Sequence, residues 1–122
     1  MGAGLRRFTP NTGNLEISTL VWLDSSVNKL QESIDAQERL KSVINQLKTF
    51  EQVDLCENYI KSRSELDRIG LIVSGSLGPP IVQKIHQLRQ VVSIYVYCGD
   101  RQKNEAWTKE FPKVFLHIGR PE

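Results

Sequence analysis

The chain has few of the residues that tie small proteins together or carry them into membranes. Its 122 residues include two cysteines, one methionine and five prolines. No apolar run approaches the length of a membrane span, and the first residues lack the apolar core of a signal peptide. The two cysteines are too few and too far apart in the chain for a metal motif or a disulfide framework. We therefore predict a cytoplasmic protein with reduced thiols and no membrane partner.

An excess of charge of either sign is also missing. The 16 basic and 14 acidic side chains give a net charge of +2, whereas nucleic-acid binding requires basic residues concentrated on one face. We therefore predict no nucleic-acid partner. The content of charged residues, 25%, and of hydrophobic residues, 39%, is ordinary for a globular domain, and the length suits a single hydrophobic core.

The most informative stretch that is present is the run Ile69–Gly75, which is IGLIVSG. Its apolar residues occupy consecutive rather than alternate positions, so both faces of a strand formed here would be covered. That is typical of a central strand in a parallel sheet with helices on both sides. The run therefore predicts an α/β fold, followed by a turn that leads into Pro79 and Pro80.

Other strand-like segments flank this run and alternate with helical ones. The predicted strands are 18–23, 47–50, 69–75, 91–97 and 114–118, and the predicted helices are 27–46, one from 54, one from 79, and 104–111. Alternation of this kind implies right-handed crossovers. We predict an α/β fold with a three-layer, doubly wound, parallel five-stranded sheet in the flavodoxin-like order 2-1-3-4-5. This single domain would span residues 15–122, after a disordered tail at 1–14.

Two of the helices carry detailed expectations. The helix over 27–46 should bury one apolar stripe at helical spacing. That stripe consists of Val27, Leu30, Ile34, Leu40, Val43, Ile44 and Leu47. The next helix should begin with Asp54 as its N-cap, with Glu57 completing a capping box. Its sheet-facing residues would be Leu55, Tyr59 and Ile60.

A candidate site follows from the strand order. In such a sheet, ligands bind outside the carboxyl ends of the strands at the point where the order reverses, here between the first and third strands. Short polar residues and glycines follow both of these strands. The candidate ligand-binding residues are Asp24, Ser25, Ser74, Gly75, Ser76 and Gly78, with Cys98, Gly99 and Asp100 beside them.

The turn from Ser74 to Gly78 has two interpretations. Its glycines would let backbone amides close on a phosphate, or they would supply the positive φ of a plain turn. Pro79 and Pro80 remove two amide donors from the helix start, and the spacing fits no phosphate-binding motif. The plain turn is therefore favoured.

Catalysis and metal binding have little support. Asp24 could act as a metal ligand or an acid, but magnesium sites usually gather more than one carboxylate, and the third strand ends in Ser74. The pattern places neither His86 nor His117 beside a serine or a cysteine, so a nucleophilic site is not indicated. We predict no catalytic residue, no metal and no cofactor, and we expect no enzyme activity.

Two known families resemble the central part of the chain. Asp24 after the first strand and the open turn after the central strand resemble a response-regulator receiver domain. Ser74 stands where the phospho-accepting aspartate would be, so this resemblance implies a receiver-like fold without phosphorylation chemistry. The run Leu71–Ser74 also resembles the central part of TIR domains, but Gln83 and Lys84 occupy the neighbourhood of their catalytic glutamate.

A closer resemblance is to an uncharacterised metazoan domain. It is carried by Trp22–Asp24, Ile44–Phe50, Leu71–Gly75, Ile85–Val91 and Ser93–Cys98. The resemblance covers residues 15–114 and implies a place at the N-terminus of larger proteins that carry an arginine ADP-ribosyltransferase or tetratricopeptide repeats. It implies no activity for this chain.

Two functions remain open. The first is a non-enzymatic protein-interaction or regulatory module, as in signalling, because no catalytic set converges. The alternative is a small-ligand or nucleotide-binding domain, TIR-like, that uses the crevice at the ends of the first and third strands. Residues 119–122 are too few for a helix that would cover the last strand. We therefore also expect a protein partner, or self-association, at the uncovered Val114–Ile118 region.

Overall fold

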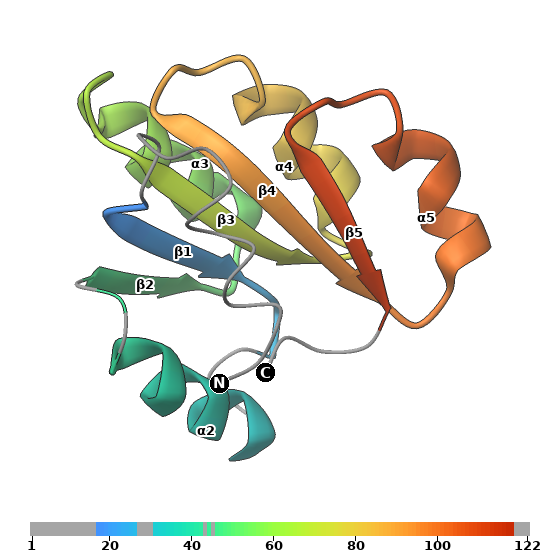
Figure 1. Cartoon of the computed structure of the whole chain (residues 1–122), viewed down its shortest axis with the longest axis horizontal. Coiled ribbons are helices and arrows are strands. Elements are labelled where there is room, and N and C mark those ends of the chain that lie inside the picture. The colour runs from blue at the N-terminus through green and yellow to red at the C-terminus, as the bar shows by residue number, and fades with distance from the viewer. Residues whose placement is uncertain (1–16, 27–30, 43, 45, 119–122) are drawn as a thin grey trace.

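The computed structural model describes residues 17–26, 31–42, 44 and 46–118, and its strands and helices alternate along the chain (Figure 1). The elements are, in chain order, β1 (Thr19–Leu23), α2 (Gln31–Lys41), β2 (Gln46–Phe50), α3 (Val53–Ser62), β3 (Ile69–Ser74), α4 (Gly78–Ile85), β4 (Val91–Cys98), α5 (Arg101–Thr108) and β5 (Val114–Ile118). The predicted tail at 1–14 lies outside the described residues.

All five strands form one parallel sheet in the order β2-β1-β3-β4-β5. This is the predicted order, and with the four helices found among the described residues it gives a flavodoxin-like α/β architecture. β1 lies between β2 and β3, so that Leu23 aligns with Phe50 on one side and with Val73 on the other. The carboxyl ends of β1, β3 and β4 therefore meet at the same edge of the sheet.

Helices cover both faces of the sheet in unequal number. α2 lies on one face, and α3, α4 and α5 lie on the other (Figure 1). The first five residues of β3 are buried, as its continuous apolar run predicts for a strand covered on both sides. Among the described helices, none is long and apolar enough to cross a membrane.

The face of the sheet under α3, α4 and α5 is aliphatic, and we call it the aliphatic face. It includes Val21, Leu23, Leu71, Val73, Ile94 and Val96 from the strands and Cys56, Ile60, Ile81, Val82 and Ile85 from the helices. Burial of apolar surface contributes about 25 cal/mol per Å² to folding. Since these side chains are almost completely removed from water, their burial stabilises the fold.

The face under α2 is aromatic and partly polar, and we call it the aromatic face. It includes Leu20, Trp22, Ile72, Tyr95 and Tyr97 from the strands and Ala36 and Leu40 from α2. The indole Nε1 of Trp22 donates a 3.1 Å hydrogen bond to the Tyr97 hydroxyl, and the two rings meet edge to face at 6.5 Å. Polar groups are therefore part of this core and not excluded from it.

α2 ends earlier than predicted. It ends at Lys41 rather than at residue 46, and the Ser42 hydroxyl donates a 2.6 Å hydrogen bond to the carbonyl oxygen of Arg39. This bond satisfies one of the carbonyl groups left without a partner at a helix end. The predicted start of this helix, at 27–30, lies outside the described residues.

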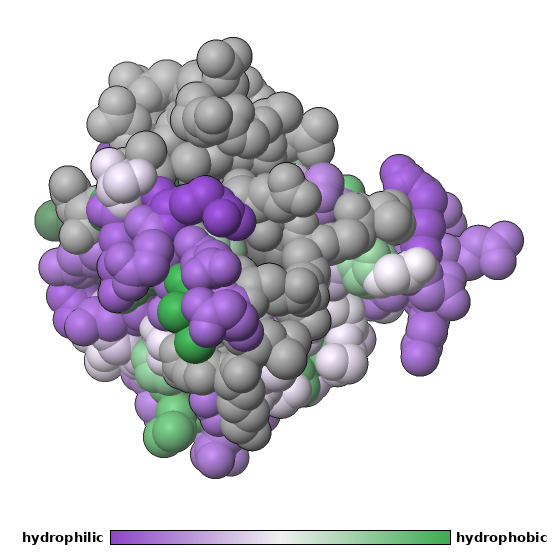
Figure 2. Space-filling view, turned by 90° about the horizontal axis from the view of Figure 1, so that it is seen from below, coloured by the Kyte–Doolittle hydropathy of each residue, from purple (hydrophilic) through white to green (hydrophobic). Residues whose placement is uncertain are grey.

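The predicted stripe of α2 is confirmed in part: Leu40 and Ile44 are buried and Leu47 is partly buried in the same core, while Val27, Leu30 and Val43 lie outside the described residues. The buried side chains of the helix are Ser33, Ala36, Gln37 and Leu40. Ile34, which belongs to the predicted stripe, is 37% exposed. Figure 2 views the molecule from the side of α2, and hydrophilic side chains dominate the part of this face that is not grey. The small and polar residues on the inner face hide the true period of the helix from an apolar pattern search.

α3 begins earlier than predicted, and the capping box is not formed. Gln52 is the N-cap, and Asp54 lies in the first turn of the helix, where a carboxylate still faces the positive end of the helix dipole. Glu57 instead pairs with Lys61 at 2.7 Å and with Lys84 of α4 at 3.5 Å. The hydrogen bond from Lys61, together with the charge of Lys84, lowers the pKa of Glu57.

The inner face of α3 is correspondingly displaced. Cys56 and Ile60 are buried, Tyr59 is half-buried, and Leu55 is 55% exposed. The predicted sheet-facing set is therefore right for Ile60 and wrong for Leu55. Residues 56 and 60 lie one above the other on a helix, so Cys56 fills the place that was predicted for Leu55.

α5 starts earlier than predicted, at Arg101, because Asp100 is its N-cap. The Asp100 carboxylate accepts a 3.1 Å hydrogen bond from the backbone N–H of Lys103, which satisfies a donor at the helix start. This start places Lys103 and Asn104 in the first turns of α5, beside the carboxyl edge of the sheet.

Candidate functional site

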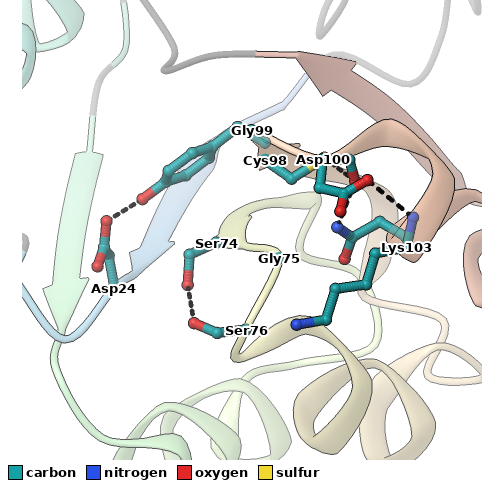
Figure 3. Close-up of a pocket in the computed structure, with 10 residues that line it drawn as sticks. Asp24, Ser74, Gly75, Ser76, Cys98, Gly99, Asp100 and Lys103 are labelled. Atoms are coloured by element: carbon teal, nitrogen blue, oxygen red, sulfur yellow. Dashed lines mark hydrogen bonds between the residues drawn. The ribbon is translucent and has the colours of Figure 1, made fainter.

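A cleft of about 540 Å³ opens at the edge of the sheet where β1, β3 and β4 end. Its walls come from the segments that follow these strands and from the start of α5 (Figure 3). It is lined by Asp24, Ser74, Gly75, Ser76, Tyr97, Cys98, Gly99, Asp100, Lys103 and Asn104. The structure therefore brings four of the six predicted ligand-binding residues together around one cavity, and it extends that cavity toward β4.

Asp24, directly after β1, is held through both carboxylate oxygens. The Tyr97 hydroxyl donates a hydrogen bond to Oδ2 (dashed in Figure 3), and the backbone N–H and hydroxyl of Ser26 donate to Oδ1 at 3.1 and 3.3 Å. Trp22 donates to the same Tyr97 hydroxyl, so the network continues into the aromatic face. Asp24 is 6% exposed. Its carboxylate therefore joins the end of β1 to the end of β4.

The end of β3 and the turn that follows it contribute two hydroxyl groups to the cleft. The Oγ atoms of Ser74 and Ser76 lie 3.3 Å apart, and either of them can donate (Figure 3). Between them, the backbone N–H of Gly75 donates a 2.9 Å hydrogen bond to the carbonyl oxygen of Tyr97. This bond continues the β3–β4 ladder past the last residue of β3, and it fixes the position of the turn against the end of β4.

The wall that α5 provides is held by a chain of side-chain hydrogen bonds. The amide Nδ2 of Asn104 donates to the carbonyl oxygen of Asp100 at 2.9 Å, and its Oδ1 accepts from Nε1 of Trp107 at 3.1 Å. Asn104 is 6% exposed. Both ends of this buried amide are therefore engaged within the protein, as buried polar groups require.

Two glycines line the cleft, and they differ in how much space surrounds them. None of the described glycines has a left-handed φ, so the predicted need for a positive φ in the Ser74–Gly78 turn is wrong. A Cβ on Gly75 would lie 2.8 Å from Oδ1 of Asn104 and 3.0 Å from Cβ of Cys98, whereas a Cβ on Gly99 would meet nothing within 4 Å. Gly75 is therefore required by close packing, and Gly99 borders open space.

The other two predicted residues, Ser25 and Gly78, do not line the cleft. Ser25 is exposed beside Asp24. Gly78 is buried at the start of α4, where a Cβ would lie 2.7 Å from the ring atoms Cη2 and Cζ2 of Trp107. The role of Gly78 is to let α4 and α5 approach each other closely.

The two cysteines have opposite surroundings. Cys98 is half-buried in the cleft wall, and its Sγ donates to the carbonyl oxygen of Asp100 at 3.5 Å. Cys56 is buried in the aliphatic face, and burial, with a smaller effect of the Glu57 charge, raises the pKa of its thiol to about 12. The thiolate is the form that reacts, so the raised pKa and the burial of Cys56 protect it from a thiol reagent, whereas Cys98 can be reached from the cleft.

Both histidines lie away from the cleft and pack against aromatic rings. His86 follows α4 and meets Phe111 edge to face at 4.8 Å, and His117 on β5 stacks on Tyr95 at 5.5 Å. Within the part of the chain that the structure describes, no group of three or more His, Cys, Asp or Glu side chains could hold a metal ion.

Three of the lining residues are not singled out by the sequence. Tyr97 belongs to an apolar strand, and its pattern indicates a buried face but not a hydrogen-bond partner. Lys103 and Asn104 require the correct start of α5. The signal for that start is Asp100, an N-cap residue directly after a Cys-Gly pair, which shifts both residues into the first turns of the helix.

The fold and the cleft define a flavodoxin-like α/β domain with a small polar cavity at the carboxyl edge of its sheet. Comparison of the chain with protein-family models, with curated proteins and with solved structures finds no match. The receiver-like, TIR-like and metazoan-domain resemblances therefore rest on the residues quoted for them, and the domain association that they imply stays a prediction.

Proposed function

We propose that this chain is a non-enzymatic regulatory domain whose cleft binds a small polar ligand. The observation that supports the proposal most is the position of the cleft, a cavity of about 540 Å³ at the carboxyl edge of the sheet. Ligands of open α/β sheets bind outside this edge, and ligand pockets commonly have volumes of a few hundred Å³. Of the two functions that the sequence leaves open, ligand binding has this geometric support.

The engagement of Asp24 and of the two histidines favours binding over catalysis. Asp24 accepts hydrogen bonds on both carboxylate oxygens, and His86 and His117 pack against rings elsewhere. A general base must reach the proton that it removes from a substrate. These groups are instead committed to contacts within the protein, which is what a binding domain needs in order to keep its cleft in shape.

A thermal-shift panel of nucleotides, dinucleotides, flavins, sugar phosphates and amino acids tests the proposal, with Gly99→Leu as the blocked variant. Gly99 lines the cleft, and a Cβ there would meet nothing within 4 Å, so a leucine at this position adds bulk at the border of the cavity without displacing protein atoms near its Cβ. A ligand that binds only the folded state raises the melting temperature by several degrees when it is well above its Kd. We expect such a shift for wild type and not for Gly99→Leu, while the two proteins without ligand melt alike.

Alkylation of Cys98 gives an independent measure of occupancy. A compound in the cleft should slow the reaction of Cys98 with iodoacetamide, and Cys56 should stay unmodified in the folded protein in every sample. The proposal is wrong if no compound of the panel changes either measurement. It is also wrong if every active compound acts equally on wild type and on Gly99→Leu.

Self-association through β5 is a second candidate function. Phe115 on this strand is 46% exposed, and β5 forms one edge of the sheet. The outer edge of a sheet carries backbone groups that can pair with another strand. Light scattering at high micromolar concentration tests this candidate, because a second copy of the chain at β5 would double the measured mass. A monomer at that concentration contradicts it.

A further inference from the structure

The cleft places an ammonium group and two hydroxyl groups around the same space. Lys103 is exposed on α5, and its side chain extends across the cleft in the direction of Ser76 (Figure 3). The hydroxyl of Ser76, on the turn after β3, pairs with that of Ser74, the last residue of the strand. Three side-chain groups that can donate hydrogen bonds therefore line one cavity: one ammonium group from α5 and two hydroxyl groups from the end of β3 and its turn.

The Lys103 ammonium group and one hydroxyl hydrogen of the serine pair are available to a ligand. Among the described residues, no carboxylate lies within ion-pair distance of the Lys103 ammonium group. In the serine pair, one hydroxyl uses its hydrogen on the other, so one O–H hydrogen is left for another acceptor. A lysine ammonium group has three N–H donors. The side of the cleft between α5 and the β3 turn thus offers donors and a positive charge.

The other polar groups of the cleft do not compete for these donors. Asp24 lies after β1, is 6% exposed, and accepts hydrogen bonds on both oxygens from Tyr97 and Ser26. The Asn104 amide is engaged at both ends. Asp100 uses Oδ1 to cap α5 and is exposed at the rim, so that its other oxygen can accept from a hydroxyl group of a ligand.

We infer that the ligand is a small phosphate monoester, and this inference rests on the proposed function of the cleft. Its phosphate would lie between the Lys103 ammonium group and the hydroxyls of Ser74 and Ser76. Phosphate oxygens accept strong charge-assisted hydrogen bonds, and lysine binds phosphate as a point charge. Its hydroxyl-bearing part would extend toward Asp100.

The size of the cleft and the start of α4 agree with this assignment. A volume of about 540 Å³ exceeds the space that a phosphate alone would fill, so the organic part of the ester has room. Pro79 and Pro80 follow Gly78 in the first turn of α4 and provide no backbone N–H there. Side chains, above all Lys103, therefore take the place of the helix amides that bind phosphate in glycine-rich loops.

Calorimetric titration of the full chain with two matched pairs of probes tests the inference. The pairs are adenosine 5′-monophosphate with adenosine, and glucose 6-phosphate with glucose. Lys103→Met removes the charge and keeps an unbranched side chain, and Lys109→Met removes the charge of another exposed lysine, which does not line the cleft. Both replacements are on the surface, where a substitution has little effect on folding.

We expect at least one phosphorylated probe to bind wild type and Lys109→Met alike. Lys103→Met should bind it about tenfold or more weakly, because a charge-assisted hydrogen bond is lost, and Gly99→Leu should not bind it. Binding should weaken as salt is added. The probe that binds shows whether the ester is a nucleotide or a sugar phosphate.

Three results would overturn the inference. If a probe and its unphosphorylated partner bind with equal affinity, and Gly99→Leu binds neither, the ligand is not recognised by a phosphate group. The cleft then remains a ligand site. Binding that Lys103→Met or Gly99→Leu leaves unchanged places the phosphate elsewhere. No binding of either phosphorylated probe at millimolar concentration refutes the phosphate as well, and the wider panel described above then decides separately whether the cleft binds another ligand.

Discussion

The two faces of the sheet are built from different side chains. The aliphatic face is filled by valine, leucine and isoleucine under three helices, and the aromatic face joins Trp22, Tyr95 and Tyr97 to α2. Hydrogen bonds between side chains run through the aromatic face, from Trp22 to Tyr97 and on to Asp24 at the cleft. The two faces therefore reach the cleft in different ways: the aromatic face through the hydrogen bonds to Asp24, and the aliphatic face through α5, whose Trp107 packs against it.

This difference predicts how each face responds to substitution. An aliphatic core has no polar partner for a group that is introduced into it, so a charge there has a large effect. A core with hydrogen bonds is sensitive to the removal of single atoms, because the partner that remains loses its bond. Two substitutions test this contrast, and a third outside both cores gives the scale of a surface contribution; they follow in order of decreasing expected effect.

Val73→Asp should have the largest effect. Val73 is fully buried in the aliphatic face, and a carboxylate there would have neither water nor a partner. We expect a loss of about 4 kcal/mol or more in the free energy of unfolding, which is enough to unfold many small domains. Circular dichroism and urea unfolding measure it. Gln102→Asp on the exposed surface of α5 is the control, and equal stability of the two variants would contradict the placement of β3.

Tyr97→Phe should have an intermediate effect. The substitution keeps the ring but removes the hydroxyl that accepts from Trp22 and donates to Asp24. We expect a loss of about 1–3 kcal/mol, because a buried indole N–H is left without its acceptor. Urea unfolding of this variant beside Tyr59→Phe, whose half-buried ring packs on Phe50, measures the contribution of the hydroxyl. Equal losses in the two variants would show that the network contributes nothing specific.

Glu57→Gln should have the smallest effect, because Glu57 lies outside both cores and joins α3 to α4 at the surface. Lys61 and Lys84 hold the pKa of Glu57 below its usual value of 4.5. A carboxyl group whose pKa is lowered by folding stabilises the fold above its unfolded pKa. The contribution is lost as the pH falls through the lowered pKa of the folded state.

The pH dependence of melting tests this expectation. Wild type should melt slightly above Glu57→Gln at pH 7, and the difference should fade as the pH is lowered below about 4.5. Glu38→Gln is a suitable control, since Glu38 and Lys41 are both well exposed and 3.9 Å apart. A difference that is the same at pH 7 and at pH 3 would show that the Glu57 ion pairs do not stabilise the fold.

The order of the strands could be predicted because burial on both faces leaves a pattern in the sequence. Ile69–Val73 is apolar at consecutive positions, and such a short run is typical of a central strand between helix layers. The bounds of the helices were less predictable, because local hydrogen bonds decide them. Ser42 closes α2 and Asp100 opens α5, and in each case several nearby polar residues could have served.

The candidate site was predicted in part for the same reason. Asp24, Ser74 and Ser76 follow strands whose order was predicted correctly, so their meeting at one edge could be expected. The role of Tyr97 could not be predicted, since its hydroxyl bonds to Asp24, which lies 73 residues away in the sequence. Lys103 depends on where α5 begins, and a shift of three residues moves it from a loop into the cleft wall.

The contact between Gly78 and Trp107 bears on the entropy of binding. The Trp107 ring lies against the start of α4, and its Nε1 holds Asn104, which in turn holds Asp100. These contacts fix the two walls of the cleft relative to each other in the free protein. A ligand would then enter a preorganised cavity and lose little affinity to the ordering of loops. Lys103, whose long side chain is exposed, would be the main group to lose conformational freedom when the ligand binds.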